Sequence, residues 1–233
     1  MIFGYRFDPT YILVIIGFLL AMFASLGVKA TFNKYNSVLS SRGFTAADVA
    51  RRILDANGLQ HIRIERVAGN LTDHFSPKEN VIRLSDATYN STSVAAIGVA
   101  AHECGHAVQH QVGYAPIKVR NGIVPFVNIC NMLALPLFVI GLIMGSGGYW
   151  LALTGVIMFS MVLVFQLVTL PTEINASRRA MATLEGMNIL VGDELNGAGK
   201  TLTAAAMTYV ASVASTALQL LRLLLILNSR RRD

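Results

Sequence analysis

The sequence predicts a mainly α membrane protein that has four transmembrane helices and a small α+β domain at the membrane surface. Only 14% of its 233 residues are charged and 54% are hydrophobic, whereas a soluble domain carries about 25% charged residues. Three long runs lack Asp, Glu, Lys and Arg, namely residues 11–28, 121–172 and 201–221. The more polar residues 29–120 combine helical and strand-like patterns and are expected to form the α+β part.

Residues 1–28 are expected to form an N-terminal transmembrane anchor. The uncharged run at 11–28 approaches the roughly 20 apolar residues that a spanning helix needs. A cleaved signal peptide is the alternative, but its apolar region is usually about 7–15 residues long. The stretch ASLGVKA at 24–30 also offers no good small-x-small cleavage site. We therefore expect an anchor that stays in the membrane.

Residues 29–120 begin with an amphipathic helix and two strands. The stretch TAADVARRILDANGL predicts a helix that is capped by Thr45 or Ser41 and stopped by the glycine near its end. Apolar and polar residues alternate at 61–67 and 81–85, which is typical of strands. The polar residues between these two strands are expected to form a loop.

Residues 121–170 are expected to form a transmembrane hairpin. The uncharged run is long enough for two spans, at about 123–144 and 149–170. The stretch GSGG at 145–148 separates them, and its glycines allow a tight reversal of the chain.

Two further segments complete the chain. Residues 171–200 are expected to form a loop and a helix that starts after the proline at their beginning, because proline is favoured at the first helical position. Residues 201–233 are expected to form a fourth span, at about 203–227, and a basic tail. An amphipathic helix on the membrane surface is the alternative for this span, because Gln219 and Arg222 interrupt it.

The net charge of +6 indicates basic loops near lipid headgroups. No nucleic-acid motif occurs, so we expect the lipid bilayer and no nucleic acid among the partners. Basic residues near the span ends are more frequent on the side that carries 29–120 and 171–200, which favours a cytoplasmic position for that side. Arg6 and the cluster at 230–232 favour the opposite orientation.

The stretch AAHECGHAVQHQ at 100–111 lies in a predicted helix at 93–111 and contains the pattern H-E-x-x-H. Because His102 and His106 lie one helical turn apart on one face, their ring nitrogens can bind the same zinc ion. Glu103, beside the first histidine, can hold and deprotonate a water molecule at such a site. A helix that is merely rich in histidine is the alternative, so the interpretation depends on a third ligand.

Two residues are candidates for the third ligand, and distance excludes the first. His110 lies eight residues after His102, about 12 Å along a straight helix, which is too far for one ion with ligand bonds of about 2 Å. Glu173 follows the third predicted span directly. The two spans between His102 and Glu173 form a hairpin, so both residues lie on the same side of the membrane. An ordinary charge at a helix N-terminus is the alternative for Glu173.

The sequence resembles the YugP-like membrane zinc metallopeptidases of bacteria over most of its length. The stretches that carry the resemblance are LTDHFSP (71–77), VIRLS (81–85), AAHECGHAVQH (100–110), GYAP (113–116) and LPTEINASRRA (170–180). The resemblance implies a multi-pass protein of the bacterial cell membrane that binds one Zn²⁺ per chain. It assigns His102, His106 and Glu173 as metal ligands and Glu103 as the catalytic base.

The stretch after the third span departs from the family pattern at one position. EINASRRA is similar to the E-x-x-A-D-x-x-A signature of gluzincin membrane proteases, in which the Asp orients a zinc-binding histidine. Here Ser177 stands in place of that Asp. A hydroxyl can still orient an imidazole, but it raises the basicity of the ring less than a carboxylate does.

These features together predict a membrane-anchored zinc endopeptidase that acts on membrane or membrane-proximal proteins bound in extended form. The strand at 81–85 is a candidate edge strand for pairing with the substrate. His74 and Tyr114 are candidates for stabilising the oxyanion. His110 is expected to support the site from outside the ligand set or to lie at the surface.

Three other functions fit parts of the sequence. A non-catalytic zinc-bound membrane scaffold would need the histidines but not Glu103. A site-2-type intramembrane protease would need an Asp ligand in a later span, and none of the four predicted spans contains Asp. A transporter or channel would need charged residues within its spans, where only Arg222 is present.

Overall fold

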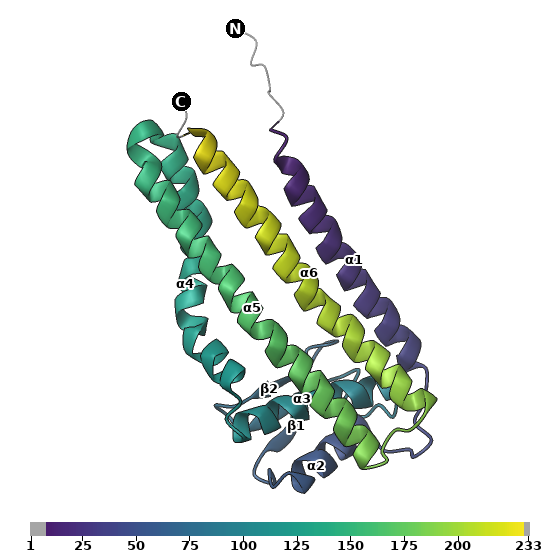
Figure 1. Cartoon of the computed structure of the whole chain (residues 1–233). Coiled ribbons are helices and arrows are strands. Elements are labelled where there is room, and N and C mark those ends of the chain that lie inside the picture. The colour runs from purple at the N-terminus through teal and green to yellow at the C-terminus, as the bar shows by residue number, and fades with distance from the viewer. Residues whose placement is uncertain (1–7, 231–233) are drawn as a thin grey trace. The chain divides into compact units, whose positions relative to one another are not determined.

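The computed structural model describes residues 8–230, so Arg6, Arg231 and Arg232 of the orientation argument lie outside the described residues. The described part is mostly helical and contains one three-stranded sheet, which confirms the predicted fold class. The elements in chain order (Figure 1) are α1 (Tyr11–Asn36), α2 (Ala46–Ala56), β1 (Arg63–Val67), β2 (His74–Ser76), β3 (Val81–Ser85), α3 (Val94–Gln111), α4 (Ala115–Ile143), η1 (Gly145–Gly148), α5 (Tyr149–Gly186) and α6 (Asp193–Arg230).

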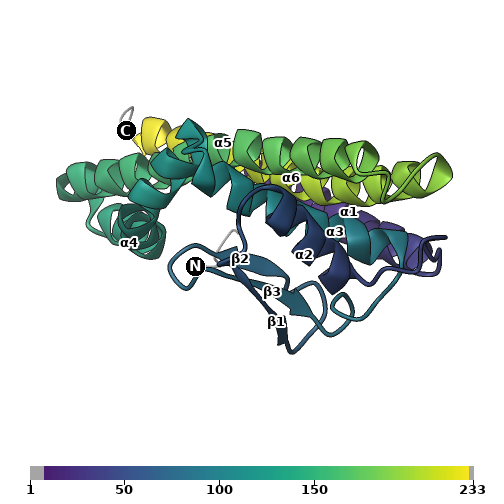
Figure 2. The ribbon, with the colours of Figure 1, turned by 90° about the horizontal axis from the view of Figure 1, so that it is seen from below.

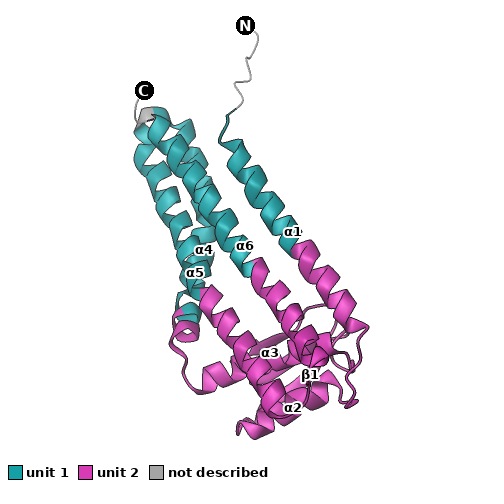
Figure 3. Cartoon of the chain, turned by 45° about the vertical axis from the view of Figure 1, so that its right-hand side comes forward, with its two compact units in different colours: residues 1–24, 120–168, 209–233 teal, residues 25–119, 169–208 magenta. Residues whose placement is uncertain are grey.

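The chain forms two compact units, which Figure 3 shows in different colours. The first comprises residues 1–24, 120–168 and 209–233, and the second comprises residues 25–119 and 169–208. The helices α1, α4, α5 and α6 each begin in one unit and end in the other. The histidine-rich helix α3 and Glu173 both belong to the second unit.

The first unit contains the apolar parts of four helices. The helices α1, α4, α5 and α6 are long and apolar enough to cross a membrane, which confirms the prediction of four candidate spans. Close glycine contacts join α4 and α5: a Cβ atom at Gly155 would lie 2.5 Å from the carbonyl oxygen of Ala134, and one at Gly141 would lie 2.4 Å from the amide nitrogen of Ala152. Small residues at helix contacts are typical of membrane-spanning helices.

The helix α5 runs without a break through Pro171. The prediction of a separate helix after this proline is therefore wrong. A proline removes one backbone donor, but apolar spanning helices tolerate it because their neighbours and local adjustments satisfy the freed carbonyl group. The continuous helix matters for the site, because Glu173 belongs to the same helix as the third candidate span.

The second unit packs α2, α3 and the sheet around a common core (Figure 2). A reciprocal pair of hydrogen bonds between Thr45 and Asp48 caps α2, so Thr45 rather than Ser41 begins this helix. The sheet order is β1-β3-β2, with β1 parallel and β2 antiparallel to β3. Large fully buried side chains of this core include Val49, Leu54, Ile82, Leu84 and Ile97.

The position of β3 corrects one functional expectation. The loop predicted between the two strands contains a third strand, β2, which is only three residues long and therefore too short for a visible alternation. It pairs with one edge of β3 while β1 pairs with the other. The strand at 81–85 thus has no free edge, and its interpretation as the strand that pairs with substrate is wrong.

Candidate metal centre

The helix α3 is held close to α5 and α6 by two glycines that its sequence places on one face. A Cβ atom at Gly105 would lie 2.7 Å from the carbonyl oxygen of Ala176 on α5, and one at Gly98 would lie 3.2 Å from the Cβ atom of Ala198 on α6. Glycine at 98 and 105 and alanine at 176 and 198 therefore allow these helices to pack closely. The side chain of Ser93 accepts a hydrogen bond from Ala96 and fixes the start of α3.

Close packing brings three potential metal ligands together. The Nε2 atom of His102 lies 3.3 Å from Oε2 of Glu173, and the Nε2 atom of His106 lies 3.5 Å from the same oxygen. Zinc bound tetrahedrally at about 2.0–2.1 Å places neighbouring ligand atoms about 3.3 Å apart. The ligand atoms of the three residues all lie within 4.8 Å of one another. Their type and spacing therefore fit one zinc ion with a position left open for water.

Each histidine ring is oriented by a polar side chain that lies beside its Nδ1 atom, the ring nitrogen that does not approach Glu173. The Nδ1 atom of His102 lies 3.1 Å from Oγ of Ser177, and the Nδ1 atom of His106 lies 3.0 Å from Oε1 of Gln109. Since a carboxamide oxygen can only accept, His106 donates from Nδ1 and keeps Nε2 free for a metal. Ser177, which stands in place of the signature's Asp, thus lies where it can orient the ring of His102.

Sequence reasoning missed Gln109. Its side chain is fully buried and its Nε2 atom donates to the carbonyl oxygen of Thr172 at 2.8 Å and to Oδ1 of Asn175 at 3.0 Å. Arg179 donates to the same Asn175 oxygen at 2.8 Å. Gln109 therefore links the ring of His106 to the turn of α5 that carries Glu173. The only signal in the sequence is its position three residues after His106, one turn along the same helix.

The centre is electronegative. Glu173 is 4% exposed and Glu103 is 8% exposed. Burial of His106 lowers its pKa, but the hydrogen bond to Glu173 and the charges of Glu103 and Glu173 outweigh burial and raise this pKa above its usual range. Glu173 and the two imidazoles provide a donor set that suits a divalent cation, and the charge of Glu103 adds to the negative potential around it.

The remaining candidates lie outside the ligand set of the described residues. His110 is exposed, and its ring lies 6.1 Å from that of Phe75 on β2, so it is not a ligand, as its distance along the helix predicts. His74 is exposed and its Nδ1 atom lies 2.8 Å from the carbonyl oxygen of Thr72. Tyr114 follows the end of α3 and is half-buried. Their roles toward the oxyanion stay predictions.

Comparison with known proteins gives the family of the chain. A family model described as "Putative neutral zinc metallopeptidase" matches residues 10–228. The "Putative membrane protease YugP" of Bacillus subtilis (strain 168) is 45% identical over 212 residues, which cover 91% of this chain and 93% of the relative. No solved structure matches the chain. Because the family model matches nearly the whole length of the chain, the chain belongs to the neutral zinc metallopeptidase family.

Proposed function

We propose that the protein is a membrane-anchored zinc endopeptidase that binds one zinc ion through His102, His106 and Glu173. The convergence of these three side chains, with ligand atoms 3.3 and 3.5 Å apart, carries the proposal. Bound zinc would polarise the scissile carbonyl and lower the pKa of a water molecule towards ~7.

Glu103 is assigned the role of general base. It neighbours His102 in sequence and lies close enough to His106 for its charge to raise the pKa of that ring. Within residues 8–230 no hydrogen bond or ion pair of its carboxylate is found. A carboxylate without a protein partner is available to take a proton from water and pass it to the leaving amine. A non-catalytic zinc scaffold gives no reason for this arrangement.

The strand β2 is the better candidate for pairing with an extended substrate. It lies at one edge of the sheet, and Phe75 on β2 approaches the ring of His110 on α3. A peptide added at this edge would run beside the helix that carries the proposed base. Backbone pairing at a sheet edge fixes an extended peptide while making few demands on its sequence.

We place the enzyme in the bacterial cell membrane with its site on the cytoplasmic side, as the distribution of basic residues favours. Its substrates are then membrane or membrane-proximal proteins. A site-2-type intramembrane protease is disfavoured, because Glu173 follows the uncharged run at 121–172 rather than lying within it.

Cleavage by a variant of the base tests the proposal. Detergent-purified protein with Glu103→Gln should cleave a pool of fluorogenic peptides at least about 100-fold more slowly than wild type and should keep its zinc. Glu185→Gln is the matched control, because Glu185 is exposed on α5. Full activity in Glu103→Gln would refute the assigned base.

A further inference from the structure

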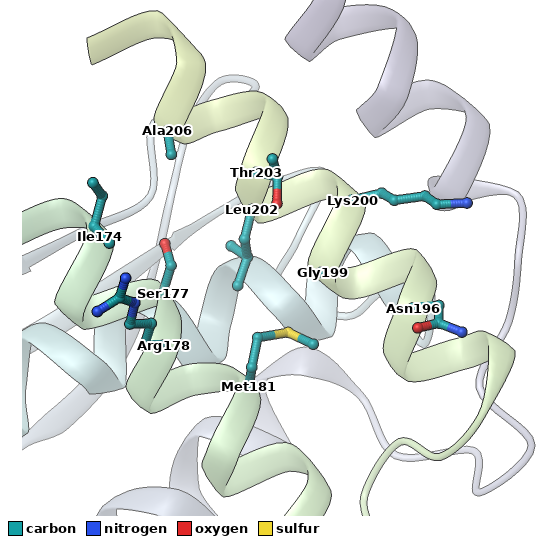
Figure 4. Close-up of a pocket in the computed structure, with 10 residues that line it drawn as sticks. All are labelled: Ile174, Ser177, Arg178, Met181, Asn196, Gly199, Lys200, Leu202, Thr203 and Ala206. Atoms are coloured by element: carbon teal, nitrogen blue, oxygen red, sulfur yellow. The ribbon is translucent and has the colours of Figure 1, made fainter. Parts of the chain in front are cut away.

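The second unit contains a pocket between α5 and α6 that the proposed reaction does not use. Its volume is about 610 Å³. The residues that line it (Figure 4) are Ile174, Ser177, Arg178, Met181, Asn196, Gly199, Lys200, Leu202, Thr203 and Ala206. The lining residues thus provide an apolar surface, two hydroxyl groups and two cations, and none of them carries a carboxylate.

The charge of this pocket favours an anionic ligand. Among the described residues, neither Arg178 nor Lys200 forms an ion pair, and both are exposed. Arg178 lies beside Ser177, whereas Lys200 extends outward from α6 on its flexible stem (Figure 4). Lys200 directly precedes the uncharged run at 201–221, and Arg178 lies within two helical turns of the end of the run at 121–172. Such positions lie at the level of the lipid headgroups when the runs span a bilayer.

Ser177 connects the pocket to the metal centre. When His102 binds a metal through Nε2, its Nδ1 carries the proton and donates to Oγ of Ser177, 3.1 Å away. The hydroxyl proton of Ser177 then needs another acceptor, and none is found among the described residues. An anion in the pocket would accept a hydrogen bond from that hydroxyl group. It would place a negative charge behind His102, where the related signature has an aspartate.

We propose that this pocket binds the phosphate headgroup of an anionic phospholipid and that the phosphate supports His102 through Ser177. The apolar residues Ile174, Leu202 and Ala206 contact the glycerol and the upper acyl carbons. Arg178 pairs with the phosphate, and Lys200, whose side chain extends away from Arg178 in Figure 4, attracts the anion from the rim of the pocket. A basic pocket between spanning helices is a known mode of recognising acidic headgroups. Lipid binding does not depend on the proposed function, whereas the support of His102 rests on it.

Lipid binding is tested first, by native mass spectrometry of the full chain in detergent. Wild type should bind one phosphatidylglycerol roughly 30-fold more tightly than phosphatidylcholine, the effect of two cations. Arg178→Gln/Lys200→Gln should lose this preference, and Ala206→Phe should lose the lipid by filling the pocket. The control Arg42→Gln/Lys78→Gln removes two exposed cations outside the pocket and should behave as wild type.

Two results would overturn the binding proposal. One is an unchanged preference for phosphatidylglycerol in Arg178→Gln/Lys200→Gln and in Ala206→Phe. The other is equal binding of glycerol 1-phosphate, which would show a site for soluble phosphates rather than for a lipid.

The link to the metal centre is tested by zinc affinity, measured by chelator competition in nanodiscs. Wild type should bind zinc about tenfold more tightly in phosphatidylglycerol than in phosphatidylcholine. Ser177→Ala should bind equally in both lipids and weakly, and Ser177→Asp equally and tightly because it carries its own carboxylate. Equal affinities for wild type would refute the link while leaving lipid binding intact. No zinc in either lipid would refute the proposed function instead.

Discussion

Both histidines of the proposed zinc site are supported by neutral side chains, Ser177 for His102 and Gln109 for His106. Neutral partners fix the orientation of a ring without adding the negative charge that a carboxylate provides. The charge in this centre comes instead from Glu173 and Glu103, which are both buried. The affinity for zinc therefore depends strongly on how well the two rings are held in place.

Gln109→Ala tests this dependence at the level of one residue. The variant removes the acceptor for His106 Nδ1 and the donors to Thr172 and Asn175, so zinc should bind about 10–100-fold more weakly. Chelator competition measures the change. Gln111→Ala is the control, since Gln111 is exposed and donates only to Asn57 near the end of α2. Unchanged zinc affinity in Gln109→Ala would show that His106 is oriented by other contacts.

The contact between α3 and α5 sets the geometry of the site at the level of the elements. Gly105→Val would place side-chain atoms against the Ala176 carbonyl oxygen, only 2.7 Å from the position of Cβ. Overpacking of this kind costs about 1–3 kcal/mol, and here it also separates the histidines from Glu173. We expect a lower Tm together with loss of zinc. In the control Gly27→Val, nothing lies within 4 Å of the new Cβ, so zinc binding should persist. Normal zinc content in Gly105→Val would show that the contact between α3 and α5 does not set the geometry of the site.

The elements that were predictable from sequence are the long or strongly patterned ones. The capped helix at Thr45, the strands at 61–67 and 81–85 and the candidate spans carry clear periodicity and are confirmed. The strand β2 is too short to show a pattern, and its place beside β3 depends on tertiary contacts. The continuity of α5 through Pro171 likewise reflects packing that overrides a local preference.

The candidate site was predictable for a different reason. His102 and His106 are four residues apart, which places them on one face of a helix. The hairpin of two spans between His102 and Glu173 predicts that these two residues lie on the same side of the membrane. The structure brings the ligand atoms of His102, His106 and Glu173 within 4.8 Å of one another. Gln109 was not predictable, because only its burial and its contacts to α5 distinguish it from any polar residue on a helix.

At the scale of the whole molecule, chemical labelling tests the orientation of the chain in the membrane. We predict that the second unit faces the cytoplasm. A cysteine introduced at exposed Lys78 should therefore resist a membrane-impermeant maleimide in intact cells and react after lysis. The background should be low because Cys104 and Cys130 are buried and burial raises the pKa of the Cys104 thiol. Labelling of Lys78→Cys in intact cells would reverse the assigned orientation.

The binding of one zinc ion by His102, His106 and Glu173 is best tested by the zinc content of the purified protein. We predict about one zinc per chain in wild type and in Glu103→Ala, with peptide cleavage only in wild type. In Glu173→Ala the third ligand is gone, so zinc should be lost. Zinc retained in Glu173→Ala, or absent from wild type, would contradict the account.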